Sequence, residues 1–141
     1  MEYLEKITAA VELGRSGERA TARNELTQLW DLTEDGQSRC VIAHFLADLQ
    51  DETEDELTWD LRALELVAED GWLPSLHLSL ADDYRRLADW DKAEQHLALG
   101  QKYVSLLADD AYGDVVRDGM QHITDALAAR TTDRLPSNPS T

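Results

Sequence analysis

The sequence predicts an all-α protein made of stacked helical hairpins, and three observations lead to this class. Helix-forming residues dominate the composition, whereas Val, Ile and Phe are few. Apolar residues recur at helical spacing in about seven segments. One pattern of small and apolar residues also returns at intervals of about 35 residues, a period typical of arrays in which each hairpin buries its apolar stripe against its neighbours. The repeated residues are Ala22, Leu26 and Leu29, then Leu57, Leu61 and Leu64, and then Ala93, Leu97 and Gly100.

The first hairpin is predicted from two helices, over residues 2–14 and 18–32. Leu4 and Ile7 share one side of the first helix, at the spacing of an amphipathic helix. The run GRSG (residues 14–17) interrupts this pattern and ends the helix. The second helix then carries the first copy of the repeated pattern.

The second hairpin is predicted between residues 38 and 70. Ser38 is the expected N-cap of its first helix, whose apolar stripe includes Ile42 and Leu46. The acidic run QDETEDE follows. Thr53 is the expected N-cap of the next helix, and the acids in the first turn suit the positive end of its dipole. An Asp-Gly pair ends this hairpin.

The third hairpin is followed by one more helix. Pro74 opens the fifth helix, and the turn ADWD (residues 88–91) leads to the sixth. A last amphipathic helix is expected over residues 110–129, where it would cover the apolar end of the array. Residues 131–141 lack apolar periodicity and are expected to be disordered. We therefore expect one helical-repeat domain over residues 1–130.

The charge balance excludes two classes of partner. The chain holds 29 acidic and 13 basic residues, a formal net charge of −16. This excess repels the phosphate backbone of nucleic acids and the anionic surface of membranes, so neither is an expected partner. Two interpretations stay open: the acids keep a small helical protein soluble, or they attract a basic partner or mimic nucleic acid.

The cysteine content and the N-terminal segment indicate a cytoplasmic protein. Cys40 is the single cysteine, and one thiol cannot form an internal disulfide. The segment MEYLEKITAA carries acid where a signal peptide needs base. No run of apolar residues is long enough to span a membrane.

One segment of the chain resembles a tetratricopeptide repeat. The segment LHLSLADDYRRLADWDKAEQHLALGQKYV (residues 76–104) covers one repeat, and the two preceding repeats match less well. The order of segments is also similar to small tetratricopeptide proteins of actinobacteria. The resemblance implies a right-handed superhelix of about three hairpins plus a C-terminal capping helix. The apolar ends of so short an array could associate, whereas the capping helix favours a single chain, so a monomer or a weak homodimer is expected. The residues that carry it are Leu80, Ala81, Tyr84, Leu87, Trp90, Asp91, Ala93 and Leu97.

The resemblance also implies a concave groove lined by the first helix of each hairpin. Residues one, four and five places after the small alanines Ala10, Ala43 and Ala81 would face it. Such a groove suits a non-catalytic adaptor that receives a peptide, a helix or a partner domain. Arginines in it could hold a carboxylate in a bidentate way. The groove residues expected from this register are Val11, Arg15, His44, Asp48, Asp82, Arg85 and Arg86, and Leu78 is expected to add apolar contact.

A second hypothesis belongs to another class of protein. His44 and Asp48 are four residues apart and share one helix face, and Asp82 lies on the next hairpin. Together they could bind a divalent metal or a small ligand, or perform acid–base chemistry. A hydrogen bond within the helix, with the acids solvated, is the favoured explanation of the same residues. Because no known catalytic, metal or cofactor spacing is present, no catalytic residue, metal or cofactor is predicted.

The chain is rich in tryptophan, with four residues of this type. Trp90 falls at an inter-helix turn, where packing explains it. Trp59 and Trp72 are either exposed anchors for a partner or packed at the edge of the core.

Overall fold

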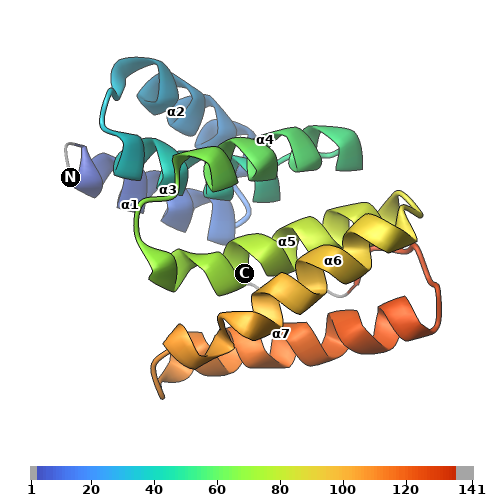
Figure 1. Ribbon diagram of the computed structural model, residues 1–141. Coiled ribbons are helices and arrows are strands. Elements are labelled where there is room, and N and C mark those ends of the chain that lie inside the picture. Colours follow the sequence, from blue (N-terminus) through green and yellow to red (C-terminus); the bar gives the residue numbers. More distant parts are fainter. Residues whose placement is uncertain (1–2, 136–141) are drawn as a thin grey trace. The chain divides into compact units, whose positions relative to one another are not determined.

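A computed structural model describes residues 3–135 and confirms the all-α class (Figure 1). Seven α-helices follow one another in this part of the chain, and neighbouring helices pack as sequential pairs, consistent with hairpin repeats. They fall into two compact units, Met1–Ala68 and Glu69–Thr141. The right-handed superhelix stays a prediction from the resemblance.

Unit 1 contains two helical pairs. Helices α1 (Leu4–Arg15) and α2 (Arg19–Leu32) form the first pair, and α3 (Gly36–Asp48) and α4 (Thr53–Leu66) form the second. In α1, α2 and α3 the small side chains that allow the helices to approach closely are those of the repeated pattern. In α4 the predicted register of Leu57, Leu61 and Leu64 was wrong by one residue, because Leu61 is 37% exposed and Ala63 takes the buried position. The small side chains with no exposed surface in the four helices are Ala10, Ala22, Ala43 and Ala63.

The start of α3 corrects one predicted cap. The helix begins at Gly36, and Asp35 is its N-cap. The Oδ2 atom of Asp35 accepts hydrogen bonds from the backbone N–H of Ser38 at 3.0 Å and from its hydroxyl at 2.6 Å. The prediction of Ser38 as the cap was wrong, because the carboxylate three residues earlier satisfies the free N–H groups of the first turn. Thr53 likewise lies inside α4, one residue after its N-cap, Glu52.

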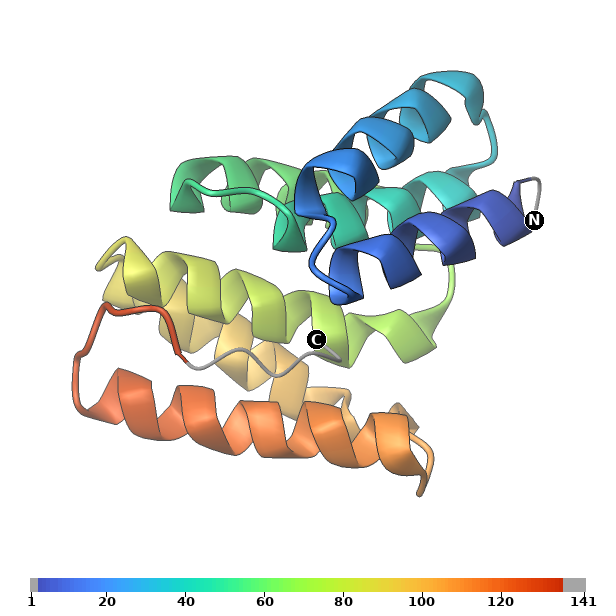
Figure 2. The ribbon, with the colours of Figure 1, turned by 180° about the vertical axis from the view of Figure 1, so that it is seen from behind.

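Unit 2 contains the third pair and the last helix. Helices α5 (Leu73–Arg86) and α6 (Trp90–Lys102) form the pair, and α7 (Ala111–Ala128) packs against both (Figure 2). Two short 3-10 turns, Asp70–Trp72 and Val104–Leu106, precede α5 and follow α6. The position of α7 on this pair agrees with its predicted role as a covering helix.

Three helices of the chain end in the same backbone motif. Gly17 (φ 99°), Ala88 (φ 59°) and Arg130 (φ 54°) adopt the left-handed conformation after α1, α5 and α7. After α5, the N–H of Ala88 donates to the carbonyl of Arg85 at 3.0 Å, and the next N–H reaches back to Tyr84 at 2.9 Å. These paired bonds are those of a Schellman motif, in which glycine is the least strained residue.

The Ala88→Gly variant is expected to be more stable than the wild type by about 1 kcal/mol, since glycine removes the left-handed strain of an exposed alanine. Urea denaturation measures the change. The matched control is Ala98→Gly, at an exposed position inside α6, which is expected to lose about 1 kcal/mol. Equal destabilisation by both substitutions would contradict the assigned backbone conformation.

The end of the described chain has no regular secondary structure. This holds for residues 131–135, and residues 136–141 of the predicted tail lie outside the described residues. The division into a domain over residues 1–130 and a disordered tail over 131–141 stays a prediction. Between residues 3 and 135, no helix is both long and apolar enough to cross a membrane.

Candidate functional site

The four groove residues predicted in unit 1 differ in their exposure. Val11 and Asp48 are half-buried, and Arg15 is exposed and pairs with Glu12 on its own helix at 3.1 Å. His44 is buried, and this burial lowers its pKa from 6.5 to about 4 because the charged imidazolium loses its hydration. His44 is therefore a neutral side chain at physiological pH.

The four groove residues predicted in unit 2 all lie on α5. Leu78 faces α7, where a Cβ added at Gly119 would lie 3.0 Å from its Cδ2 atom. Asp82 accepts from both neighbouring arginines, from Nη2 of Arg85 at 2.8 Å and from Nε of Arg86 at 3.1 Å. The Arg85 side chain is 0% exposed and that of Arg86 is 5% exposed. Both guanidinium groups are thus engaged by their own chain.

Arg85 also bonds to the segment that follows α7. Its Nη1 donates to the carbonyl oxygen of Thr131 at 2.8 Å, and its Nη2 donates to that of Asp133 at 2.8 Å. The predicted tail therefore begins on the α5 face that the sequence assigns to the groove.

The alternative metal or ligand cluster gains no support from the geometry. His44 and Asp48 belong to unit 1, whereas Asp82 belongs to unit 2. The carboxylate of Asp82 forms ion pairs with Arg85 and Arg86. In the described part of the chain, no group of three or more His, Cys, Asp or Glu side chains could hold a metal ion. Cys40 is buried, and its thiol donates to the carbonyl of Ala63 at 3.3 Å.

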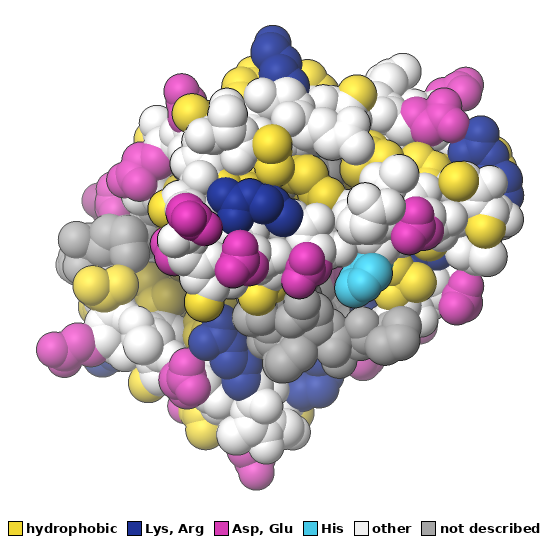
Figure 3. All heavy atoms as spheres, turned by 90° about the horizontal axis from the view of Figure 1, so that it is seen from below, with side chains coloured by type: hydrophobic (Ala, Val, Ile, Leu, Met, Phe, Trp, Pro, Cys, Tyr) yellow, Lys and Arg dark blue, Asp and Glu magenta, His cyan; other side chains and the backbone are white. Residues whose placement is uncertain are grey.

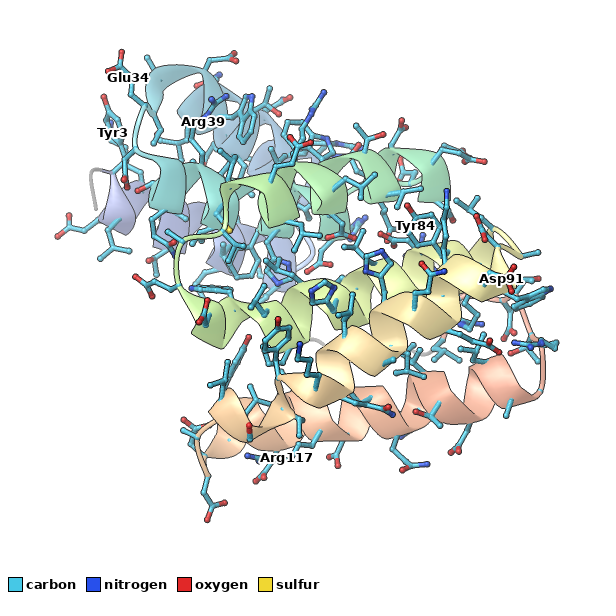
Figure 4. The ribbon with its side chains drawn as sticks, viewed as in Figure 1. Tyr3, Glu34, Arg39, Tyr84, Asp91 and Arg117 are labelled. Carbon is cyan, nitrogen blue, oxygen red and sulfur yellow. The ribbon has the colours of Figure 1, made fainter. Side chains whose placement is uncertain are left out.

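A row of four aromatic rings lies between α5 and α6, which the sequence did not indicate. Its order is Tyr84, His96, His77 and Tyr103, and Tyr84 is labelled in Figure 4. The two histidines have a Nδ1–Nδ1 distance of 3.0 Å and a centroid distance of 5.3 Å. This distance is that of a hydrogen bond in which one Nδ1 donates and the other accepts, according to the tautomers of the two rings. Burial, together with the neighbouring His96, lowers the pKa of His77 to about 4.

Unit 1 carries a surface of alternating arginine and tryptophan side chains, which we call the Trp–Arg face. The guanidinium carbon of Arg39 lies 3.8 Å from the ring centroid of Trp30. The ring of Trp30 meets that of Trp59 edge-on at 5.0 Å, and Arg62 lies 4.5 Å from the Trp59 ring. Arg39 is labelled in Figure 4. Helices α2, α3 and α4 each contribute to this face.

The two arginines of the Trp–Arg face lack an acidic partner in a strongly acidic chain. Within residues 3–135, neither Arg39 nor Arg62 forms an ion pair or a hydrogen bond. The Nε atom of Arg39 is buried without a hydrogen-bond partner. By contrast, ion pairs are formed by Arg15, Arg19, Arg23, Arg85, Arg86, Arg117 and Arg130.

The sequence pointed to this face only in part. Trp59 was expected either as an exposed partner anchor or as a residue packed at the edge of the core, and it is half-buried, as is Trp30. Arg39 could not be assigned to it, because it reaches Trp30 from another helix. The spacing of Trp59 and Arg62, three residues apart in one helix, was a signal that the sequence offered. Figure 3 shows acidic side chains scattered over one side of the molecule. Both interpretations of the net charge stay predictions.

The geometry defines a class of protein: an all-helical chain whose described helices pack as sequential pairs. Comparisons of the sequence with protein-family models and with curated proteins, and of the fold with solved structures, found no match.

Proposed function

We propose that the protein is a non-catalytic interaction module, built from tetratricopeptide-like hairpins, that binds another protein or peptide. The observation that carries this proposal is the Trp–Arg face of unit 1. Tryptophan and arginine are the side chains most enriched among residues that dominate binding energy at protein interfaces. Here they lie together at the surface, and the arginines have no acid of their own in the described chain.

The stacking of the arginines prepares them to bind a partner. A guanidinium that lies flat on an indole keeps its N–H groups in its own plane, directed away from the ring. These donors can then bind carboxylate or carbonyl oxygens that arrive edge-on. The indole fixes the side chain before binding, so less conformational entropy is lost when the partner arrives.

The predicted groove remains a second contact surface of the same proposal. Its residues in unit 1 and in unit 2 were predicted from their spacing after the small alanine of each hairpin. Leu78 and Arg85 are covered by their own chain, which makes the Trp–Arg face the better-supported contact.

The double variant Arg39→Ala/Arg62→Ala is expected to lose partner binding at least tenfold, since each arginine removed from an interface centre costs about 1 kcal/mol or more. Affinity capture from the native cell, followed by quantitative mass spectrometry, measures the loss. Circular dichroism verifies that the variant keeps its helices.

The matched control is Arg19→Ala/Arg23→Ala. It removes the same charge from the same unit, at two arginines that both pair with Asp51. This control is expected to keep its captured partners. If the Arg39→Ala/Arg62→Ala protein captures the same set as the wild type, the Trp–Arg face is not the contact surface.

A further inference from the structure

The pair of His77 and His96 is a feature of the molecule that the proposed function does not use. His77 lies on α5 and His96 on α6, and their Nδ1 atoms are 3.0 Å apart. Between residues 3 and 135, neither imidazole makes a second hydrogen bond. Both rings therefore direct one nitrogen into the same space between two helices.

The packing of α5 on α6 holds the two rings together. Gly100 lies one turn after His96, and a Cβ added to it would lie 3.5 Å from the Cβ of His77. The missing side chain thus lets the backbone of α6 come close to His77. Tyr84 stacks on His96 at a centroid distance of 5.5 Å, and Tyr103 stacks on His77 at 6.2 Å. An aromatic ring therefore bounds the pair on each side.

Two neutral imidazoles in this arrangement can do more than form one hydrogen bond. In one combination of tautomers, the Nδ1 of one ring carries the proton that the other Nδ1 accepts. When the donating ring carries its proton on Nε2 instead, two Nδ1 lone pairs face each other with no proton between them. A metal ion can then take the place of the proton, since neutral imidazole is the commonest protein ligand of metal ions.

The distance between the nitrogens suits two ligands of one metal ion. An imidazole nitrogen binds Zn²⁺ at about 2.0–2.1 Å, so two such ligands on neighbouring positions of the ion are about 2.9–3.4 Å apart. The observed 3.0 Å lies in this range. The centroid distance of 5.3 Å shows that the nitrogens now face each other head-on. Each ring therefore turns about its Cβ–Cγ bond so that both lone pairs meet at the ion.

The charge state of the pair at neutral pH also favours a metal ion. Burial, together with the neighbouring His96, lowers the pKa of His77 to about 4, and burial and Lys92 lower that of His96. Both rings are neutral at pH 7, so a metal ion does not compete with a proton on an imidazolium. Lys92 opposes the metal ion, because its ammonium repels positive charge at His96.

We propose that His77 and His96 form a binding site for a late first-row divalent metal ion, which joins α5 to α6. Each Nδ1 supplies one ligand, and water fills the other positions of the ion. The donating ring loses its Nδ1 proton to solvent and takes one up on Nε2, so it stays neutral. Imidazole suits Cu²⁺, Ni²⁺ and Zn²⁺, of which Cu²⁺ binds most tightly. The inference goes beyond the proposed function, since it concerns unit 2 and depends on neither Arg39 nor Arg62.

Thermal unfolding of the full-length protein with added metal tests the proposal. The protein is freed of metal with a chelator, dialysed, and heated at pH 7 with and without Ni²⁺, while circular dichroism follows the helices. At about 1 mM Ni²⁺ the Tm is expected to rise by about 3 °C or more. His77→Gln and His96→Gln are each expected to lose most of this rise. The matched control is His122→Gln, at an exposed position on α7, which is expected to keep it.

Electron paramagnetic resonance of the equimolar Cu²⁺ complex identifies the ligands. The wild type and His122→Gln are expected to show hyperfine coupling to two imidazole nitrogens, and each variant of the pair to one or none. Lys92→Gln is expected to bind the metal about threefold more tightly, since the nearby positive charge is removed. A hydrogen bond with a structural role alone would give neither the coupling nor this gain.

Two outcomes would overturn the proposal. The first is a Tm that Ni²⁺ does not raise. The second is a rise that survives in both His77→Gln and His96→Gln, since the metal then binds elsewhere. If a glutamine variant loses its helices, the wild-type Cu²⁺ spectrum decides, because a spectrum without coupling to two nitrogens contradicts the site by itself.

Discussion

The Gly113→Ala variant is expected to lose roughly 3 kcal/mol of stability or more, the largest effect of any single methyl group added to this chain. A Cβ at this position would lie 2.1 Å from the carbonyl oxygen of Ala108 and 3.0 Å from Nη1 of Arg117. The first contact is with backbone. Relieving it moves the turn before α7, where Arg117 donates to the Ala108 carbonyl at 3.0 Å and Asp110 caps the Gly113 N–H at 2.8 Å.

Urea denaturation of the two proteins measures this loss. Gly119→Ala is the matched control, because it adds the same methyl group to the same helix. Its Cβ would lie 3.0 Å from the end of the Leu78 side chain, which can rotate away, and alanine favours the helix. The control is expected to stay within about 1 kcal/mol of the wild type. A Gly113→Ala protein as stable as the wild type would show that the turn before α7 has another conformation.

Acidification from pH 6.5 to pH 4 is expected to destabilise the protein by about 3 kcal/mol through His44. The pKa of this side chain is lowered from 6.5 to about 4 in the folded state. Between these values the unfolded chain binds a proton that the folded chain does not, so stability falls as the pH falls. Well above pH 6.5 both states are neutral and the effect vanishes. His77, whose pKa is also lowered to about 4, acts in the same direction.

Chemical denaturation at a series of pH values measures this dependence. His44→Gln is the control, since glutamine is polar and does not titrate. Between pH 4 and 6.5, the free energy of unfolding of this variant is expected to depend less steeply on pH than that of the wild type. The difference is up to about 1.4 kcal/mol per pH unit, which is the contribution of one proton. Identical pH profiles for the two proteins would mean that His44 is accessible to solvent and takes up its proton in the folded state.

The helices could be predicted from the sequence because their causes are local. Apolar spacing and the small residues that allow close packing both follow the helical period, as at Ala43 and Ala81. The caps were less certain. Asp35, rather than Ser38, is the N-cap of α3, because either side chain is chemically able to accept from the first turn and only the backbone geometry decides between them.

The candidate site could be predicted only in part, because its contacts join residues far apart in the sequence. The expected groove arginines Arg85 and Arg86 lie on α5, where the register put them. The sequence could not show that Thr131 and Asp133, 46 and 48 residues later, accept hydrogen bonds from Arg85. A helix register fixes which residues share a face, but not which distant segment covers that face.

The Trp–Arg face illustrates the same limit. Trp30 and Trp59 come from α2 and α4, which both pack on α3, so only the fold of unit 1 brings their rings together. The abundance of tryptophan was visible in the sequence. The sequence did not show that Arg39 lacks an acidic partner, because Asp31, Glu34 and Asp35 are all close to it along the chain.

Hydrogen–deuterium exchange of the protein, with and without its captured partner, tests the central claim most directly. The account predicts slower exchange on binding in the segments that carry Trp30, Arg39, Trp59 and Arg62, and no chemical change in the partner. Protection confined to other segments of unit 1, or turnover of a small molecule by the protein alone, would contradict it.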